Sequence, residues 1–462
     1  MYGLIILVIY ALVMIGVTLI TKEKCVGESY HVGNREKGAF ISAMSIAATW
    51  IWAPALFTSS EKAYLNGFAG LFWFVVPNVL CLVLFIPFAI KIRKEMPKGI
   101  TLSGYMQMKY NSKSVKHIYL MQLTLLAILS TAVQLLAGGI VLSTITGIPL
   151  WVMTIILSVI AFSYAQISGI CASILTDVIQ MLFMIGVCLI VVPLAIQLNG
   201  GVEMIQLSGI SGRYGNLFSG SGIEVLLSFG IPTTIGLLAG PFGDQCFWQR
   251  AFSIKEKSIS RAFMLGAILF AIVPLSMGVL GFVAAGIGMG SMNAGMINFE
   301  LITNLLPAWV IIPFMAMLLS GLLSTIDSNL CAVSSLTTDM QVTSKLSNVD
   351  KIKVSKISMI IILVISNLIA NVPGLTVTQM FLFYCTFRAT TMLPTILTLL
   401  NVKLTSRGIV IGIITSLVVG LPVFAYGTIY NNYAYKTMGS ILTVLLAGII
   451  ALLLRKRGSD KC

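Results

Sequence analysis

The chain has 462 residues, of which 58% are hydrophobic and only 10% are charged. Soluble domains carry roughly 45–50% apolar and about 25% charged residues, so this composition excludes secreted enzymes, DNA-binding modules and cytosolic enzymes. The net charge is +14, and the eight cysteines show no CxxC pair that would predict a zinc site or a disulfide framework. Both histidines, His31 and His117, are expected in polar loops. The mean hydropathy of +0.99 predicts an all-α polytopic membrane protein.

Thirteen apolar runs are long enough to cross a bilayer, which takes roughly 17–25 residues. They cover about residues 3–21, 39–59, 68–90, 118–142, 149–168, 171–197, 225–249, 263–287, 307–337, 357–372, 376–399, 408–427 and 437–454. The first run lacks a basic stretch before it and an A-x-A cleavage site, so we expect a helix rather than a signal peptide. Residues 1–462 are predicted to form a single transmembrane domain.

Nearly all basic residues lie in the polar segments between or after these runs. If the N-terminus lies outside, the cytoplasmic segments hold 25 of the 29 Lys and Arg residues, the external loops hold three, and Arg388 lies within a span. These cytoplasmic segments are 22–38, 91–117, 250–262, 338–356, 400–407 and 455–462. The asymmetry follows the positive-inside rule. We therefore expect a multi-pass protein of the plasma (inner) membrane with a cytoplasmic C-terminus and no nucleic-acid partner.

Two runs are interrupted near their middle. The second contains Pro54, and the seventh contains Gly240, Pro241 and Gly243 just before Asp244. Broken helices persist in membranes where they line a cavity or are buried, and corresponding breaks in two halves indicate the inverted repeats of a secondary transporter. Because the breaks are five runs apart, we predict five-helix repeats at 39–197 and 225–399, with 1–21 and 408–454 peripheral. Gly and Pro are also common in ordinary transmembrane helices, so spacing alone leaves both interpretations open.

Four ionisable residues lie within the predicted spans, where a charge is costly unless it faces a cavity or a partner. They are Asp177, Asp244, Asp327 and Arg388. Around Asp327, four residues are spaced i, i+3, i+4 and i+7 and so share one helical face. These residues are Gly321, Ser324, Thr325 and Ser328. A face of hydroxyls suits a hard cation such as Na⁺ rather than zinc or copper, although hydroxyls also join membrane helices by hydrogen bonds alone.

Three segments resemble the sodium:solute symporter family, which has a leucine-transporter-like fold. Ser324-Thr325-Ile326-Asp327-Ser328 matches the family pattern S-T-x-D-S. Residues 168–180 are similar to G-G-x-x-A-x-x-x-T-D-x-x-Q, with Ser168 in place of the first glycine. Residues 244–252, which read DQCFWQRAF, are similar to D-Q-x-x-W-Q-R-A. The resemblance implies Na⁺-coupled symport of a small polar organic solute by alternating access.

The resemblance also implies where the ions bind. The main Na⁺ site would lie between the broken second span and the ninth span. Its ligands would be the carbonyls of Ala48, Ile51 and Gly321 and the hydroxyls of Ser324 and Thr325. Some family members add a second sodium, which here would involve Ser324 together with Asp177, Asp327 and Ser328.

The solute pocket of the family lies beside the break in the second span. The residues expected to face it are Thr49, Trp52, Ala55, Phe74, Asp244 and Gln245. The segment from Ala48 to Ala53 is most similar to the urea-transporter branch, so a urea-like solute or an amino acid is expected. On an unbroken helix Trp50 and Trp52 would point about 200° apart, so one of them is expected to pack in the core. No obligatory protein partner is implied.

An enzyme and a sensor are the two other classes of protein that compete with the first class, a symporter. An intramembrane aspartyl protease would pair Asp177 with Asp327, but neither stands in the Tyr-Asp or Gly-x-Gly-Asp context of such enzymes. A membrane-embedded transferase would want a catalytic His or Cys, and both histidines are expected in loops. A transporter-like sensor or receptor is the third class, although no kinase segment follows. Solute accumulation would distinguish a symporter from all of these, and no enzymatic activity is expected.

Overall fold

The computed structural model describes the chain except for residues 1, 21–26, 292, 341–342, 344–345 and 456–462. The first half contains α1 (Tyr2–Leu19), α2 (Ser29–Val32), α3 (Ala39–Trp50), α4 (Ala53–Leu56), α5 (Thr58–Glu95), α6 (Leu102–Tyr110), α7 (Lys113–Thr146), α8 (Leu150–Ser168), α9 (Ile170–Leu198), α10 (Val202–Ile205) and η2 (Gln206–Ile210). The described residues are thus helical apart from turns, loops and an isolated β-bridge between Lys37 and Ile254.

The second half repeats this pattern of long helices joined by short connections. It contains α11 (Gly220–Val225), η3 (Leu226–Gly230), α12 (Ile231–Leu238), α13 (Gly240–Gly243), α14 (Gln245–Ser253), η4 (Glu256–Ser258), α15 (Ile259–Gly286), η5 (Ala294–Met296), α16 (Ile297–Leu305), α17 (Ala308–Thr337), α18 (Asn348–Ala370), α19 (Val377–Ala389), α20 (Met392–Leu399), α21 (Ser406–Thr415), η7 (Ser416–Gly420), α22 (Leu421–Ile429) and α23 (Tyr433–Leu453).

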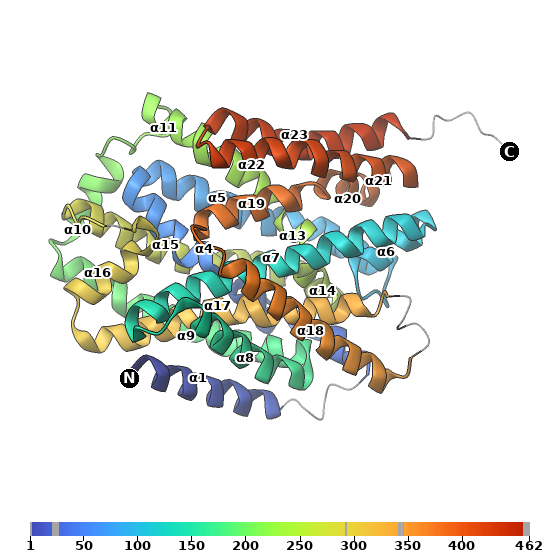
Figure 1. Ribbon diagram of the computed structural model, residues 1–462, viewed down its shortest axis with the longest axis horizontal. Helices are drawn as coiled ribbons and strands as arrows, with labels where there is room; N and C mark the ends of the chain where they lie inside the picture. Colours follow the sequence, from blue (N-terminus) through green and yellow to red (C-terminus); the bar gives the residue numbers. More distant parts are fainter. Residues whose placement is uncertain (1, 21–26, 292, 341–342, 344–345, 456–462) are drawn as a thin grey trace.

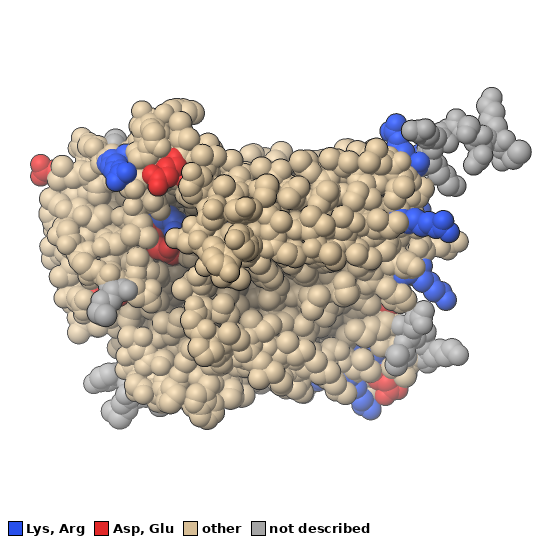
Figure 2. Space-filling model, turned by 45° about the horizontal axis from the view of Figure 1, so that its top comes forward, with Lys and Arg blue, Asp and Glu red and all other residues tan. Residues whose placement is uncertain are grey.

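Eleven helical segments of the described chain are long and apolar enough to cross a membrane. The prediction of a polytopic helical membrane protein is confirmed. Two further apolar helices, Leu7–Leu19 and Ala39–Trp50, are shorter than a full span, so the count of thirteen stays a prediction. Figure 2 shows a broad band without charged side chains between the two ends of the molecule, where the Lys, Arg, Asp and Glu side chains gather.

The helices pack into one bundle with flanking layers. At its centre α15 packs against α3 and α5, while α17 packs against α7 and α9. The N-terminal α1 lies along one side against α8 and α9, and the C-terminal α21, α22 and α23 pack together on the opposite side (Figure 1). The residues before and after the two predicted repeats therefore lie at the periphery of the bundle, around a core made of α3 to α9 and α12 to α19.

The first break lies between α3 and α4. Ile51 and Trp52 leave the helical conformation there, with φ/ψ of −82°/82° and −104°/178°. Pro54 follows at the start of α4, where its fixed φ suits a helix N-terminus. Since proline has no N–H, it cannot donate to the carbonyl of Trp50 four residues earlier. The interruption predicted from Pro54 is confirmed.

The N–H groups on either side of Pro54 are also diverted from the helical pattern. Ala53 donates to Oε1 of Gln134 on α7 at 2.6 Å. Ala55 donates to the carbonyl of Trp52 at 2.9 Å instead of the carbonyl four residues back. The carbonyls of Thr49 and Ile51 have therefore lost their i+4 donors, and they are free to accept from another group.

The second break lies between α13 and α14 at Asp244, which is extended with φ/ψ of −102°/115°. Gly240, at the start of α13, marks a close approach of the two broken helices. A Cβ atom at Gly240 would lie 2.3 Å from the Trp50 indole, so any other residue would push the indole away. The interruption predicted around Gly240 and Pro241 is confirmed, and the two breaks lie side by side in the core.

Three expectations about polar residues need correction. His31 is not in an exposed loop: it lies in α2 with 3% of its surface exposed, 3.3 Å from the Ser334 hydroxyl, and burial lowers its pKa to about 4. Arg250 is not in a cytoplasmic loop, because it is 1% exposed within α14. Cys171 is disulfide-bonded, although the cysteine spacing implied no such bond.

Candidate functional site

Four oxygen atoms meet where the first break touches α17. The Thr325 hydroxyl lies 3.2 Å from the Thr49 carbonyl, 3.5 Å from the Ile51 carbonyl and 3.2 Å from the Gly321 carbonyl. One hydroxyl has a single proton to donate, so it cannot satisfy three carbonyls. The group therefore has more acceptor lone pairs than hydroxyl protons, and such oxygen atoms are the ligands that a hard cation takes.

The remaining predicted ligands of the main ion site lie next to this group. The carbonyl of Ala48 accepts the Ile51 N–H at 3.2 Å, which uses part of its capacity. The Ser324 hydroxyl donates to Oδ1 of Asp177 at 2.5 Å rather than joining the carbonyls. The structure thus adds the Thr49 carbonyl to the predicted positions and links Ser324 to a neighbouring carboxylate.

Beside the carbonyls lies a second polar group, which we call the hydroxyl cluster: Asp177, Asp327, Arg250, Ser324 and Ser328. Arg250 and Asp177 form an ion pair at 2.8 Å, with side-chain exposures of 2% and 0%. Arg250 also donates to the Ser328 hydroxyl at 2.8 Å. Because bare buried charges are costly, these contacts are what permit Asp177 and Arg250 to stay in the core.

Asp327 is held by a different set of donors. The Ser173 hydroxyl donates to its Oδ1 at 2.8 Å and the Thr176 hydroxyl donates to its Oδ2 at 3.4 Å. At formal charges the hydroxyl cluster carries two carboxylates and one guanidinium. Two of the residues predicted to hold a second sodium, Asp177 and Ser328, therefore already have a cationic partner within the protein.

A third group lies on the other side of the first break, and we call it the aromatic cluster: Trp50, Trp52, Tyr384, Asp244 and Arg388. Arg388 and Asp244 form an ion pair at 3.3 Å, and the Tyr384 hydroxyl donates to the other oxygen of the carboxylate. The Arg388 guanidinium lies over the rings of Tyr384, Trp50 and Trp52, 4.9, 5.3 and 5.5 Å from their centroids. Cation–π contacts of this kind stabilise a buried guanidinium.

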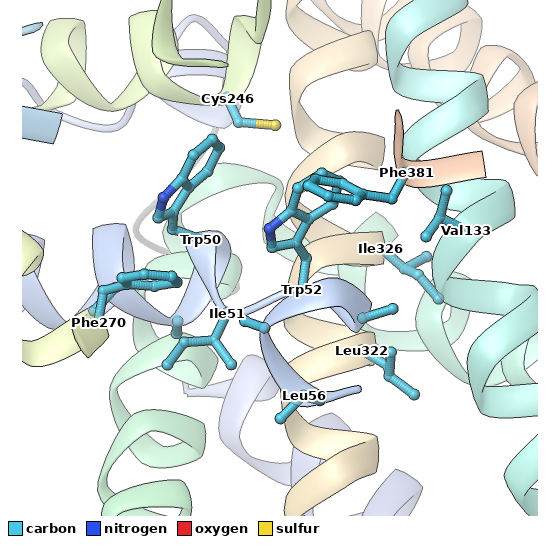
Figure 3. Close-up of a cluster of buried hydrophobic side chains, with 14 of the residues drawn as sticks. Trp50, Ile51, Trp52, Leu56, Val133, Cys246, Phe270, Leu322, Ile326 and Phe381 are labelled. Atoms are coloured by element: carbon cyan, nitrogen blue, oxygen red, sulfur yellow. The ribbon is translucent and has the colours of Figure 1, made fainter. Parts of the chain in front are cut away.

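The expectation that Trp50 and Trp52 point away from each other is wrong. Their rings are stacked, 5.9 Å apart with 21° between the planes, because the chain leaves the helix between them. Figure 3 shows the two indoles next to each other, with Phe381 against Trp52. Phe381 in turn contacts Phe74, so Phe74 reaches the group through one intervening ring.

Two residues predicted to face the solute have side chains that lie outside the aromatic cluster. The Gln245 amide donates to the Ile100 carbonyl at 2.9 Å and accepts from the Leu102 N–H at 3.1 Å, so it holds the start of α6. The Thr49 hydroxyl lies 3.0 Å from the Ser328 hydroxyl, on the side of the hydroxyl cluster. Ala55 is fully buried in α4. Of the six predicted residues, the structure brings Trp52 and Asp244 together and places Phe74 close by.

Several residues of the site were missed by sequence reasoning. Phe381 and Tyr384 are two of them. They lie seven and four residues before Arg388, the charge already noted in this span, so a search along its helical face could have found both. Gln134 is one of two amides in the apolar span 118–142, the other being Gln122, and such a residue is a candidate partner for a broken helix. Arg250 gave no such signal, because it stands at the end of an apolar run where a basic residue usually marks the cytoplasmic boundary.

Two broken helices meeting in a helical bundle, with free carbonyls at one break, define a secondary transporter of the inverted-repeat type. Solved structures support this architecture. The chain is similar to a Na⁺-coupled sialic acid symporter in its substrate-bound outward-open state, with a TM-score of 0.79, 20% identity and 98% of both chains covered. It is also similar to MhsT in complex with L-phenylalanine, with a TM-score of 0.57, 12% identity and 91% and 98% of the two chains covered. The predicted all-α membrane fold with two broken helices is confirmed, and the bounds of the two five-helix repeats stay a prediction.

The sequence model of the sodium:solute symporter family matches residues 30–416, and the chain belongs to that family. It is 21% identical to the urea-proton symporter DUR3 of Oryza sativa subsp. japonica, over 92% of this chain and 65% of that protein. It is 26% identical to the sodium/pantothenate symporter of Haemophilus influenzae, over 74% and 72%. The chain spans only 42% of the probable urea active transporter 1 of Schizosaccharomyces pombe.

Proposed function

We propose that this chain carries a small polar organic solute across the plasma membrane together with Na⁺, by alternating access. Family membership supports coupled transport, and the relatives are named for urea and pantothenate. The asymmetry of basic residues supports an N-terminus outside and a C-terminus in the cytoplasm.

One observation carries the proposal: the oxygens that surround the Thr325 hydroxyl. An ion there would join the first break to α17, with the carbonyls of Thr49, Ile51 and Gly321 as ligands. Ala48 and Ser324 complete the set after a small rearrangement of their present hydrogen bonds. Because such a site is made of two helices that move relative to each other, ion binding favours one state of the transport cycle.

The second ion site remains part of the proposal, with a condition. Asp177 and Ser328 could hold a further cation, together with Asp327, only if that cation shares the oxygens of Asp177 and Ser328 with Arg250. A guanidinium and a sodium ion would then compete for the same carboxylate. We therefore assign coupling to the main site and regard the hydroxyl cluster as its polar neighbour.

We place the solute at the aromatic cluster, beside both breaks. Trp52 and Asp244 would contact the solute directly. Phe74 would act through Phe381, which it contacts, and Ala55 lies in α4, which follows the first break. Binding sites of inverted-repeat transporters form at discontinuous helices near the membrane centre. We assign Gln245 to the attachment of α6 rather than to the pocket, since both ends of its amide are already used.

Uptake by proteoliposomes tests the function. Radiolabelled urea, amino acids, pantothenate and other small solutes would be offered under an inward Na⁺ gradient, with an equal K⁺ gradient as the control. We expect Na⁺-dependent accumulation of at least one solute. Accumulation that is equal in K⁺ and Na⁺, or absent for the whole panel, would contradict the proposal.

A further inference from the structure

Arg388 belongs to no predicted ion or solute site, yet it touches both broken helices. Its Nε donates to the Gly236 carbonyl on α12 at 2.6 Å, and its Nη1 reaches Asp244 beyond the break. Its guanidinium also covers the indoles of Trp50 and Trp52 on either side of the first break. A single cation from α19 thus stands at the point where both breaks meet.

The contact between Arg388 and Asp244 cancels their charges without using up their hydrogen-bonding capacity. It joins one nitrogen to one oxygen at 3.3 Å, whereas a bidentate pair would use two of each. Arg388 has five N–H donors, and its described hydrogen bonds go to Gly236, Asp244 and the Cys385 sulfur. Two of its five N–H donors therefore make no hydrogen bond with the described residues.

The Trp52 indole supplies a further donor that lacks a partner. Trp52 is only 2% exposed, so water does not solvate its indole N–H. Within the described part of the chain this N–H makes no hydrogen bond. By contrast, the Trp50 indole donates to the Asn78 carbonyl at 3.2 Å. A buried donor without an acceptor costs about 1–3 kcal/mol, so an unpaired one at a helix break is a place where a ligand acceptor fits.

We propose that Arg388 and Asp244 set the charge selectivity of the transporter, and that the solute has zero net charge. This inference rests on the proposed function. The solute would offer an acceptor, such as an amide or ureido carbonyl, to the Trp52 N–H, and a donor to the Asp244 carboxylate. A net anion or cation would add an uncompensated charge to a buried pair that is already neutral, and such a charge is strongly disfavoured.

The proposal predicts opposite changes for the two halves of the pair. Arg388→Gln leaves Asp244 unpaired, so the pocket would prefer a cation. Asp244→Asn leaves Arg388 unpaired, so the pocket would prefer an anion. The double variant Arg388→Gln/Asp244→Asn is neutral again and would return to neutral solutes. Asp350→Asn, which removes an exposed carboxylate far from the breaks, is the matched control.

The experiment measures Na⁺-driven uptake of neutral urea and acetamide, zwitterionic proline, cationic acetamidinium and choline, and anionic acetate and pantothenate. For wild type and the control we expect the best solute to be net neutral. Each single variant should change the ratio of charged to neutral uptake by about tenfold or more, in opposite directions. The double variant separates charge from misfolding, because it carries both substitutions and should recover the wild-type ranking.

Each remaining outcome has one meaning. A wild-type preference for an anion or a cation would overturn the inference, as would single variants that fold and keep the wild-type ranking. A double variant that folds without recovering that ranking would overturn it as well. These results would leave Na⁺-coupled transport standing. If wild type takes up no solute of the panel in a Na⁺-dependent way, the proposed function fails and this inference fails with it.

Discussion

The core holds two arginine–aspartate pairs that differ in their surroundings. In the hydroxyl cluster, Arg250 and Asp177 are surrounded by serines, and each charged group makes several hydrogen bonds. In the aromatic cluster, Arg388 and Asp244 share one contact and lie against Trp50, Trp52 and Tyr384.

Hydroxyls fix the position of a charge, because each one supplies a directed hydrogen bond. Aromatic rings stabilise a cation without consuming its N–H groups. The first arrangement suits a region that must hold its shape beside an ion site. The second leaves donors available, as a region that admits a changing ligand requires.

The largest expected effect follows from removing Arg250. Arg250→Ala leaves Asp177 buried without its cationic partner, which costs about 3–5 kcal/mol in comparable pairs. We expect a large loss of folded protein, measured as unfolding of the detergent-solubilised transporter. Arg250 donates to the Ser45 hydroxyl at 3.0 Å as well as to Asp177 and Ser328. Arg250→Lys keeps the charge but cannot make all three contacts, so its stability should be intermediate. An Arg250→Ala protein as stable as wild type would show that the hydroxyl cluster does not depend on its ion pair.

A smaller effect is expected in the aromatic cluster. Trp52→Ala should raise the KM for solute by about tenfold, since a stacking contact and a hydrogen bond each contribute about 0.5–1.5 kcal/mol. Trp52→Phe keeps the ring and should lose only the hydrogen-bond part. The dependence on Na⁺ should stay the same in both, because the Thr49 and Ile51 ligands are backbone carbonyls.

Trp50→Ala is the companion measurement in the same uptake assay. Its indole N–H is already bonded to Asn78, so its truncation should alter KM less than that of Trp52. If Trp50 controls KM and Trp52 does not, the placement of the solute on the aromatic cluster is wrong.

The main ion site lies between the two clusters. A substitution there should change the dependence of uptake on Na⁺ and leave stability nearly unchanged. Thr325→Ala should raise the Na⁺ concentration for half-maximal uptake about two- to tenfold, since one hydroxyl ligand is lost. Stability should change little, because a hydroxyl in a membrane bundle contributes about 0.6 kcal/mol. Thr325→Ser keeps the oxygen and should behave as wild type. Ser366→Ala, which removes a buried hydroxyl bonded to Ile128 outside the site, controls for packing. Unchanged Na⁺ dependence in Thr325→Ala would remove this site from the mechanism.

The smallest effect is expected for an ion pair outside the core. Lys353 and Asp350 are 3.3 Å apart with side-chain exposures of 71% and 48%, so water solvates both charges. Lys353→Ala should give no measurable shift in melting temperature under the conditions that unfold Arg250→Ala. A clear destabilisation would mean that burial does not explain why the ion pairs of the core contribute more to stability than exposed pairs.

Much of the site could be predicted from particular residues. Pro54 marked a candidate position for the first break, because a residue without an N–H removes one hydrogen bond of the helical pattern. Pro193, Pro274 and Pro313 also lack this donor, yet they stand inside helices that continue through them. The spacing of Gly321, Ser324 and Thr325 placed them on one face of α17. Asp177, Asp244, Asp327 and Arg388 were singled out by their cost in a membrane span, although that cost names no partner and left the role of Arg388 open.

The sequence by itself therefore determined the membrane class, the candidate positions of the two breaks and the chemistry of the hydroxyl face, because these depend on local composition and helical period. Only the tertiary structure decided the pairs: Arg250 with Asp177, Arg388 with Asp244, Gln134 with the Ala53 N–H, and Trp50 stacked on Trp52. The physical reason is that a charge or an unpaired N–H must find a partner in the core. Which partner it finds depends on how helices far apart in the chain pack together, and on how the break at Ile51 turns the chain.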